Sequence, residues 1–453
     1  MVEKKQWSTN LLFLITAIGT EAGIANFWKF TYLAGQNGGA TFVFVYFLAL
    51  ATLAVPALGA EMLIGRYCGR SVAGCMRVLV ERDGINPFWK VYGPIALTGI
   101  FLVLSFYFVV CGWMLQYFWL ALTGSFTHIQ ASQAAALYGA MLAHPAGMLG
   151  FSGTFILVTT IIVAHGVNKG IERVSGVLTP LRFLILIGLC AYAAAVGDTR
   201  SAARFLLAFR FDRLTPQVVL VAVGQAFFSL GVGGGVLMTV AAYMKREYSI
   251  MKSVFTVAFA QGLVAVLAGF SIFPLVFAYG LEPTGGPGLV FQTLPVAFGS
   301  MPFGGAFGTV MFLVLSFTGL TATIVLLEAI VAFLEEYTRC SRPVATYGAG
   351  LAIWLAGFLT AFSFSSWKDV HPLALLGFRS TRTVFDLIDY LASNIFLPVG
   401  GLMVAGIAGW ALSQETVSRE LGIGNGRAFH LWRTTVRYVV PIVLGIVFIS
   451  IQR

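Results

Sequence analysis

The sequence predicts an all-α polytopic membrane protein, and three observations carry that prediction. The chain of 453 residues is 58% hydrophobic and only 10% charged, with a mean hydropathy of +0.88. Soluble domains carry about 25% charged residues, so this composition argues against soluble domains. The apolar residues gather in segments of about 20, the length of a membrane-spanning helix. The basic residues behind the net charge of +10 fall mainly in alternate connections between these segments.

Eleven segments are long and apolar enough to span a bilayer as helices. An odd number of spans places the two termini on opposite sides of the membrane. The longest connections, near 124–150, 198–215, 280–303 and 364–382, hold most of the Gly, Pro and polar residues and have room for short helices. We expect the spans near residues 10–33, 40–67, 92–123, 151–168, 175–197, 216–244, 252–279, 304–337, 344–363, 383–413 and 431–450.

The distribution of basic residues predicts the orientation. Lys4 and Lys5 precede the first span, and five basic residues lie between the second and third, in the range 66–90. Cytoplasmic loops carry this excess, so we expect a multi-pass protein of the cell inner (plasma) membrane with its N-terminus cytoplasmic. The four arginines of 200–213 depart from the pattern. We therefore expect the positively charged loops to face a lipid bilayer, and we do not expect the protein to bind nucleic acid.

Other features of the composition narrow the class of protein further. The first segment is too long and too polar for the apolar region of a cleavable signal peptide. The five cysteines are scattered without metal-ligand spacing, so neither disulfides nor a metal cluster is expected. We expect a monomer or a weak dimer. The five histidines show no spacing such as HExxH, so an intramembrane enzyme is not expected.

The first span is interrupted by a polar, glycine-bearing stretch, Gly19 to Asn26, which includes Glu21. A carboxylate and a carboxamide at mid-membrane depth are expensive to bury. Non-helical backbone persists there only where protein surrounds it or a wet cavity adjoins it. Secondary transporters build substrate sites from broken helices of this kind, so the first span indicates transport.

The sixth span is interrupted in the same way. Residues 231–235 contain four glycines, each costing about 1 kcal/mol relative to alanine inside a helix. The first and sixth spans each begin a set of five, and breaks at matching positions indicate an inverted repeat with a site between its halves. We expect a first repeat near 10–197, a second near 216–413 and an extra helix near 431–450. Close helix packing would also explain the glycines, but not Glu21 and Asn26 in the matching break.

Several motifs along the chain occur in the order found in one transporter family. They are residues 23–30 (Gly-Ile-Ala-Asn-Phe-Trp-Lys-Phe), 37–42, 61–67, 224–228, 286–291, 293–295, 319–321 and 385–390. With them the chain resembles the neurotransmitter:sodium symporter family, whose structural prototype is the bacterial leucine transporter. The resemblance implies a leucine-transporter-type fold over 1–453, as one transmembrane domain. This fold is a 5+5 inverted repeat with broken helices 1 and 6, plus an eleventh helix as in shorter bacterial members.

The resemblance also implies a central substrate site between spans 1, 3, 6 and 8. Backbone N–H groups of Ile24 and Ala25 would receive a substrate carboxylate with the Tyr107 hydroxyl, and Phe228 would act as an aromatic lid. Small residues in the side-chain pocket favour a bulky or aromatic substrate. The implied substrate-binding residues are Glu21, Ala22, Gly23, Ile24, Ala25, Val103, Tyr107, Phe228, Ser229, Gly231, Gly234, Ala322 and Leu326. The expected function is cation-coupled symport, with sodium as the expected ion, of a hydrophobic or aromatic amino acid by alternating access.

Two pairs of charges correspond to the family's gates. Lys29 would face Asp389 at the outer side, and Lys4 would face Glu336 at the cytoplasmic side. Lys29 stands where the family has arginine, so the bidentate geometry is lost and a looser outer pair is expected. A lysine that reaches from the membrane interface to water is the alternative for Lys29. Trp7 resembles the family's N-terminal inner latch.

Two sodium sites are implied, and both are altered. The first would use the Asn26 side chain, the Glu21 carbonyl and the Ser229 hydroxyl, but the expected asparagine of span 7 falls at Ala260. The second would use the carbonyls of Gly19, Ala22 and Thr318 and two hydroxyls of span 8. Thr321 supplies one hydroxyl, but Ala322 cannot supply the other. A hard cation needs several oxygen ligands, so these losses matter. The implied metal ligands that remain are Gly19, Glu21, Ala22, Asn26, Ser229, Thr318 and Thr321.

Chloride dependence is left open by the sequence. The family's chloride-dependent members bind the ion near the positions of Tyr46, Gln225 and Ser229, all of which keep suitable side chains here. The acid that replaces chloride in other members would fall at Val264, which is neutral.

Glu21 is the residue that the family pattern does not explain, and three roles compete for it. It replaces a sodium ligand, it titrates and couples transport to protons, or it binds a donor on a substrate without a carboxylate. A protonated glutamate that only holds the backbone shape is a fourth, less favoured reading. The alternative function is therefore transport of an amino-acid-derived amine or indole-type compound, proton-coupled through Glu21. A receptor or channel on the same fold is favoured least.

Overall fold

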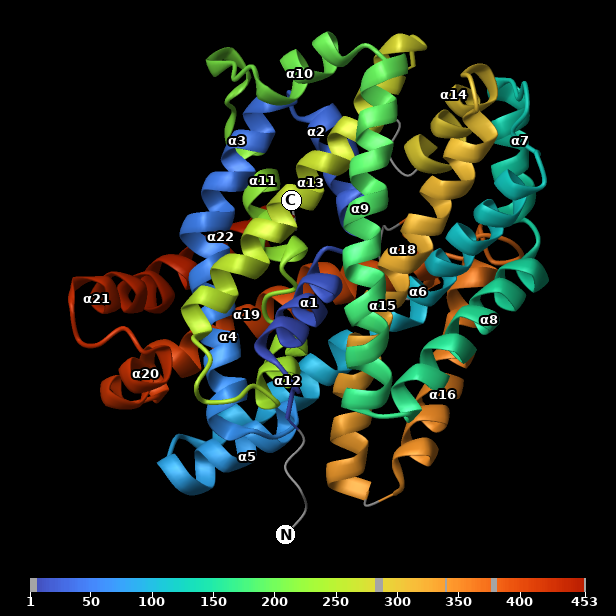
Figure 1. Ribbon diagram of the computed structural model, residues 1–453. Helices are drawn as coiled ribbons and strands as arrows, with labels where there is room; N and C mark the ends of the chain where they lie inside the picture. The colour runs from blue at the N-terminus through green and yellow to red at the C-terminus, as the bar shows by residue number, and fades with distance from the viewer. Residues whose placement is uncertain (1–5, 282–287, 339, 376–380, 452–453) are drawn as a thin grey trace.

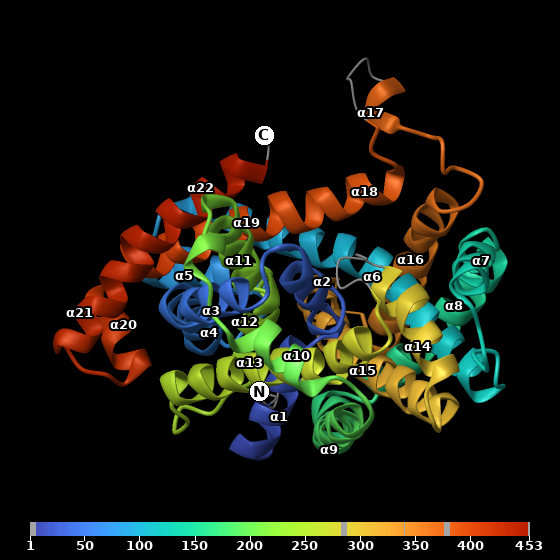
Figure 2. The same ribbon diagram turned by 90° about the horizontal axis from the view of Figure 1, so that it is seen from above.

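The computed structural model describes residues 6–281, 288–338, 340–375 and 381–451, and every regular element in these ranges is a helix (Figures 1 and 2). The α-helices are α1 Asn10–Glu21, α2 Lys29–Gln36, α3 Ala40–Ala49, α4 Val55–Cys68, α5 Val72–Asp83, α6 Tyr92–Leu122, α7 Ala131–Leu142, α8 Pro145–Ala164, α9 Arg173–Val196, α10 Thr199–Leu207, α11 Pro216–Ser229, α12 Val236–Ala242, α13 Ile250–Ala278, α14 Leu294–Ser300, α15 Gly304–Thr338, α16 Arg342–Ser363, α17 Pro372–Leu375, α18 Val384–Asp389, α19 Leu397–Gly406, α20 Gln414–Leu421, α21 Arg427–Thr434 and α22 Val440–Ile451.

Short 3-10 or π-helical turns join many of these helices. The 3-10 turns are η1 Ile24–Asn26, η3 Pro87–Val91 and η5 Phe211–Arg213. The π-helical turns are η2 Leu50–Ala54, η4 Val167–Glu172, η6 Leu289–Thr293, η7 Tyr390–Phe396, η8 Ile407–Ala411 and η9 Thr435–Val439. Several turns continue one helix into the next, so η2 joins α3 to α4 in a single span.

Nine continuous helices in the described ranges are long and apolar enough to cross a membrane, and the bent pair α1 and α2 makes a tenth. The interrupted α11 and α12 occupy the sixth position of the expected order. The expected spans therefore have counterparts, although their ends differ. The fourth begins at Pro145 rather than near 151, because proline suits the first turn of a helix and the His144 side chain caps it.

The expected loop helices are present as well. Helices α7, α10 and α17 lie in three of the four long connections, and η6 with α14 lies in the fourth. Helices α10, α14 and α7 lie at the end of the molecule opposite the N-terminus, while α5 lies beside the N-terminus (Figure 1). Helices α20 and α21 project to one side of the bundle in both views (Figures 1 and 2).

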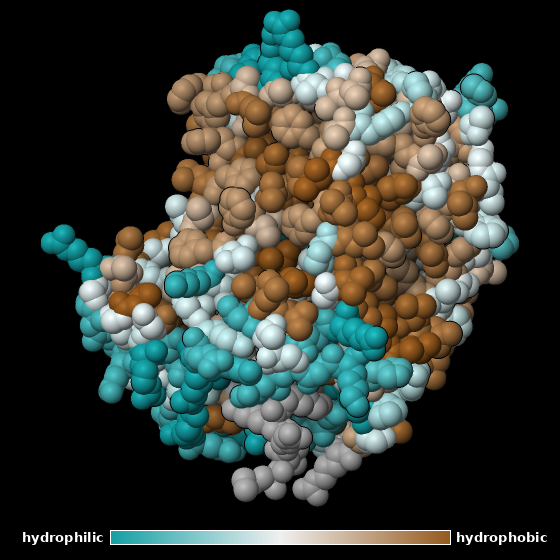
Figure 3. All heavy atoms as spheres, in the orientation of Figure 1, coloured by the Kyte–Doolittle hydropathy of each residue, from teal (hydrophilic) through white to brown (hydrophobic). Residues whose placement is uncertain are grey.

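The outer surface shows a broad apolar band (Figure 3). Large apolar side chains are exposed on several helices, among them Leu184 of α9, Phe259 of α13 and Ile442 of α22 at 68%, 75% and 60%. Polar and charged side chains collect at the end that carries the N-terminus. Apolar side chains spread over several helices in this way are typical of a lipid-facing surface.

Both broken helices have their exposed backbone groups satisfied from neighbouring helices. Helices α1 and α2 meet at an angle of 50°. Gly231, Gly233 and Gly235 have φ angles of 52°, 93° and 74°, a region that favours glycine. The Gly233 N–H donates to the Glu61 carboxylate at 2.8 Å, and the Tyr92 hydroxyl donates to the Gly233 carbonyl at 3.2 Å. Buried side chains thus replace the missing helical hydrogen bonds.

Helices α9, α13 and α15 surround α1, which also contacts α12 beyond the second break. The half-helices therefore meet in the middle of the bundle, where residues of the two breaks are buried. This is the place that the sequence assigns to the site.

We predict that Gly65→Ala destabilises the protein, because the new methyl group would collide with the backbone of Met238 at the start of α12. Overpacking of this kind costs about 1–3 kcal/mol. Thermal unfolding in detergent, followed by size-exclusion fluorescence, measures the loss as a lower midpoint.

Gly348→Ala on α16 is the matched control, because nothing lies within 4 Å of its added methyl group. Alanine is a better helix former than glycine, so its midpoint stays equal or rises. Equal midpoints for both variants would contradict the close packing of α4 on α12.

Candidate functional site

A cavity of about 200 Å³ lies where the first span is broken. Its walls come from η1 and α2, from α6 and from the end of α11, together with α18. The lining residues are Ile24, Ala25, Trp28, Lys29, Tyr32, Phe106, Tyr107, Val110, Phe228, Phe385 and Asp389. It lies on the α2 side of the break, away from the N-terminal end of the molecule.

Polar groups of the broken first span and of α6 meet at this cavity. The Ile24 N–H donates to the Tyr107 hydroxyl at 3.4 Å, and a methyl group added at Gly23 would lie 3.3 Å from the same oxygen. Gly23 precedes η1, so the first N–H groups of that turn lack helical partners. A hydroxyl and backbone N–H groups at one apolar cavity form a pocket suited to a carboxylate.

The outer charged pair lies in the same cavity but is not closed. No ion pair within 4 Å joins Lys29 and Asp389 in the part of the chain that the structure describes. Instead, the Lys29 ammonium lies 3.6 Å from the centre of the Phe228 ring, and the Ser393 hydroxyl donates to the Asp389 carboxylate at 2.8 Å. A cation over an aromatic face is attracted by the ring quadrupole, so Lys29 contacts the Phe228 ring rather than the Asp389 carboxylate.

Other residues expected at the substrate site lie deeper, or face elsewhere. Val103, Gly231, Gly234, Ala322 and Leu326 are not among the residues that line the cavity. A methyl group added at Gly234 would lie 3.2 Å from the Leu397 side chain, so this glycine leaves no free space toward the substrate. At Gly234 alone, the missing side chain does not enlarge the cavity, because Leu397 of α19 fills the space. The larger pocket expected from Gly231 and Ala322 stays a prediction.

Glu21 is the last residue of α1, and its carboxylate reaches the second break. A methyl group added at Gly231 would lie 3.3 Å from Glu21 Oε2. The residue is 9% exposed, and no hydrogen bond to its carboxylate forms within the described ranges. The absence of a side chain at Gly231 therefore gives room to a buried acid that lacks a protein partner. An acid inside a membrane span is a candidate functional group, and this carboxylate is free to meet a ligand or a proton.

The first expected cation site contains a pair of amides. Asn26 Nδ2 donates to Gln261 Oε1 at 3.0 Å, and Gln261 Nε2 donates to Asn26 Oδ1 at 2.8 Å, both fully within the core. The sequence reading of span 7 at Ala260 is therefore wrong by one residue, because the side chain that faces Asn26 is that of Gln261. An amide oxygen is present here after all. Amide oxygens are ligands that hard cations accept, and here each of the two accepts from the other residue's amide group.

The residues expected at a chloride site are close together in part. The Ser229 hydroxyl lies 3.1 Å from the Tyr46 hydroxyl, and it also donates to the Ala226 carbonyl. The amide of Gln225 is buried, and neither its oxygen nor its nitrogen has a protein partner in the described structure.

The second expected cation site holds its oxygens together but also contains a positive charge. The Thr321 hydroxyl lies 2.9 Å from the Gly19 carbonyl and 3.1 Å from the Thr318 carbonyl. Arg182 of α9 donates from Nη1 to the Ala22 carbonyl at 3.0 Å. The residues present therefore do not fit a sodium ion at this second site. Sequence reasoning passed over Arg182, although an arginine inside an apolar span is itself a functional signal.

The N-terminal end of the molecule is closed by hydrogen bonds. The indole N–H of Trp7 donates to the Val240 carbonyl at 2.8 Å, and the side chain is 2% exposed. Backbone and hydroxyl of Ser8 both donate to the Glu172 carboxylate at 2.7 Å. These contacts fix the first residues across α12 and η4.

Of the two residues expected at the inner gate, the structure describes Glu336. Lys4 lies outside the described residues. Glu336 accepts from the Ser71 N–H at 3.1 Å and pairs with Arg70 at 3.9 Å. Its carboxylate is thus held by Arg70 and Ser71, the two residues just before α5.

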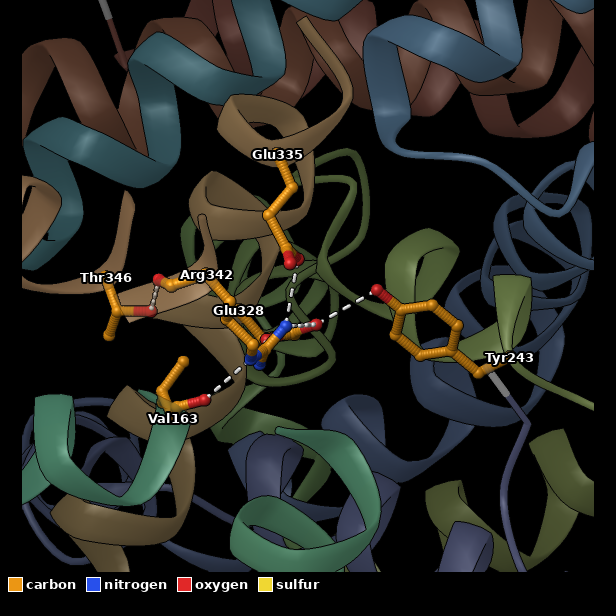
Figure 4. A network of polar contacts seen from close by, with 6 residues as sticks. All are labelled: Val163, Tyr243, Glu328, Glu335, Arg342 and Thr346. Atoms are coloured by element: carbon orange, nitrogen blue, oxygen red, sulfur yellow. Dashed lines mark hydrogen bonds and ion pairs between the residues drawn. The ribbon is translucent and has the colours of Figure 1, made fainter. Parts of the chain in front are cut away.

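A second ionic network joins α15, α16 and the end of α12 (Figure 4). Arg342 pairs with the Glu328 carboxylate and, at 3.0 Å, with Glu335. The Tyr243 hydroxyl donates to Glu328 at 2.9 Å. The broken sixth span is thereby linked to α15 and α16 at its far end.

Comparison with known proteins identifies relatives along the entire chain. The model of the sodium:neurotransmitter symporter family matches residues 4–136 and 144–452. An uncharacterized sodium-dependent transporter of Bacillus subtilis, YhdH, is 33% identical over 100% of this chain and 99% of its own. The sodium-dependent dopamine transporter of Bos taurus is 24% identical over 99% of this chain and 69% of its own. The crystal structure of MhsT in complex with L-phenylalanine is 34% identical, covers 99% of this chain and 100% of its own, and has a TM-score of 0.89.

We predict that Gln261→Ala weakens both the fold and sodium binding, because it leaves the buried Asn26 amide unpaired. An unsatisfied buried amide costs about 1–3 kcal/mol. Thermal midpoints in sodium and in potassium buffer measure the two effects separately.

Gln414→Ala on the exposed start of α20 is the control, and neither midpoint should change. A Gln261→Ala protein that keeps the wild-type midpoint and the wild-type gain in sodium would contradict the role given to this amide pair.

Proposed function

Because this chain belongs to the sodium:neurotransmitter symporter family, a family of multi-pass membrane transporters, we propose that it carries a hydrophobic or aromatic amino acid together with sodium. It does so by alternating access to a central site between spans 1, 3, 6 and 8. We place it in the cell inner membrane with its N-terminus cytoplasmic, as the basic residues at that end indicate. Its partners are then the small-molecule substrate and the lipid bilayer.

The observation that carries this proposal is the pairing of the Tyr107 hydroxyl with the Ile24 N–H at the wall of an apolar cavity. Their distance of 3.4 Å is long for a hydrogen bond, so both groups have spare capacity for a ligand. A carboxylate placed there accepts from the hydroxyl and from the backbone N–H groups of η1. The apolar remainder of the cavity suits an apolar side chain.

The aromatic part of the proposal has a second support. Phe106, Phe228 and Phe385 line the cavity, and aromatic rings stack favourably against one another. The similar transporter MhsT has L-phenylalanine in its crystal structure, at 34% identity to this chain. We therefore take L-phenylalanine as the first probe for this protein.

Sodium, when bound, supplies a positive charge beside the substrate carboxylate. The residues that would hold it at the first site are Asn26, Gln261 and Glu21. The Ser229 hydroxyl, just before the second break, would be a further ligand. Glu21 requires this charge, because an unneutralised carboxylate near the substrate carboxylate would repel it. Substrate and cation would then bind together rather than separately, which is the basis of symport.

One observation favours a second candidate substrate class. The unpartnered carboxylate of Glu21 would bind an ammonium group directly, without a cation between them. An amine or indole-type compound without a carboxylate would then replace the amino acid, with protons as the coupling ion through Glu21.

We predict that proteoliposomes with an inward sodium gradient accumulate L-phenylalanine but not phenethylamine, which lacks the carboxylate. Tyr107→Phe should lower this uptake by about ten- to a hundredfold, because one hydrogen bond to a charged group is worth about 1.5–3 kcal/mol. Radiolabelled uptake measures both effects.

Tyr347→Phe, on a residue that is 46% exposed, is the control and should transport normally. Accumulation of phenethylamine alone would favour the second candidate. Saturable binding of L-phenylalanine without accumulation would contradict transport and favour a receptor.

We further predict that Glu21→Gln changes the ion dependence of uptake. The neutral amide removes the negative charge that the first site offers a cation, so half-maximal uptake should require about tenfold more sodium. Uptake measured against sodium concentration at several pH values tests this.

Glu415→Gln, on an exposed glutamate of α20, provides the control. If sodium and pH profiles of Glu21→Gln match those of the wild type, Glu21 serves only the shape of the backbone. A profile that loses its pH dependence alone would favour proton coupling over sodium.

A further inference from the structure

Arg182 is a positive charge buried at the centre of the protein without an acidic partner. It lies in the middle of α9, and its side chain has no exposed surface. No carboxylate lies within 4 Å of it among the described residues. Burying a charge without a counter-ion is strongly unfavourable, so other groups in the structure must stabilise it.

The stabilising groups are oxygens of the first and eighth spans. Arg182 Nη1 donates to the Ala22 carbonyl at 3.0 Å and to the Thr321 hydroxyl at 3.4 Å. The same hydroxyl lies 2.9 Å from the Gly19 carbonyl and 3.1 Å from the Thr318 carbonyl. Gly19 and Ala22 belong to the end of α1, where a helix carries partial negative charge. The guanidinium is thus held by dipoles rather than by an acid.

These four oxygens are the ones that the family resemblance assigns to a second sodium ion. A fifth ligand is missing, because Ala322 has no hydroxyl. The nearby Thr323 hydroxyl does not replace it, since it lies 3.3 Å from Thr159 on α8. One oxygen ligand has therefore been lost, and a permanent cation has been added, at the same site.

A sodium ion and the guanidinium cannot share this site favourably. Both need the Ala22 carbonyl and the Thr321 hydroxyl, and two positive charges at adjacent positions repel each other. Arginine stays protonated at any physiological pH, so its charge is always present. We propose that the guanidinium of Arg182 takes the place of the second sodium ion, so that this transporter binds one sodium ion fewer than its two-site relatives.

A tethered cation changes what the site can do. Arg182 stabilises the contact between α1, α9 and α15 in every cycle, but it cannot be carried across the membrane. Its Nε and Nη2 are buried without partners in the described structure, so the guanidinium has donors in reserve when the helices rearrange. The sodium gradient would then act through the first site alone. This inference rests on the proposed sodium-coupled function.

The test counts sodium ions on the purified full-length chain with radioactive sodium in equilibrium dialysis, using potassium as the balancing ion. The wild type should bind one ion per chain. Arg182→Met with Ala322→Ser removes the guanidinium and restores the hydroxyl, and this double variant should bind one ion more. Ala322→Ser alone, which keeps the arginine, and Arg182→Lys, which keeps the charge, should both bind the wild-type number.

Two sodium ions on the wild type would overturn the proposal. So would a folded double variant, judged by a single size-exclusion peak, that gains no ion. If the double variant does not fold, the wild-type count decides alone: one ion supports the proposal and two refute it. If instead the proposed sodium-coupled function is wrong, the wild type binds no sodium at all. An additional ion on the double variant would then still support the role of Arg182.

Discussion

The structure depends on one constraint: backbone that leaves the helix inside a membrane must find hydrogen-bond partners within the protein. Side chains from intact helices meet this demand at both breaks. Glu61 of α4 accepts from the Gly233 N–H, and Tyr92 of α6 donates to the Gly233 carbonyl. At the first break Arg182 of α9 donates to the Ala22 carbonyl. Where the helical hydrogen bonds stop, backbone polar groups become available to a ligand, and side chains of neighbouring helices hold the broken segment in place.

The breaks themselves could be predicted from the sequence, because glycines and a carboxylate within an apolar span leave few alternatives. The motifs placed Ile24, Tyr107 and Phe228 at one site, and all three line the cavity. The prediction failed where a residue had to be aligned far from any motif. Span 7 contains few motif residues, so the position that faces Asn26 was assigned to Ala260 instead of its neighbour Gln261. The direction of Gly234 toward Leu397 depends on how α19 packs, which no local pattern specifies.

Arg182 shows a different limit of sequence reasoning. None of the motifs that carry the family resemblance lies in α9, so Arg182 drew no attention. Only the three-dimensional contact of α9 with α1 and α15 brings its guanidinium to the oxygens of Gly19, Ala22 and Thr321. The loss of a hydroxyl at Ala322 was visible in the sequence, but its compensation was not.

The closure at Trp7 and the cavity at Tyr107 lie on opposite sides of the first break. Trp7 is nearly inaccessible, whereas the Tyr107, Lys29 and Phe228 side chains keep part of their surface exposed. The molecule in this conformation is therefore asymmetric with respect to the two compartments. A solute that arrives from the α2 side reaches the cavity beside Ile24. One that arrives from the N-terminal side meets the hydrogen bonds of Trp7 and Ser8. This conformation therefore offers the site to one compartment only, and the hydrogen bonds of Trp7 and Ser8 must break before the other compartment can reach it.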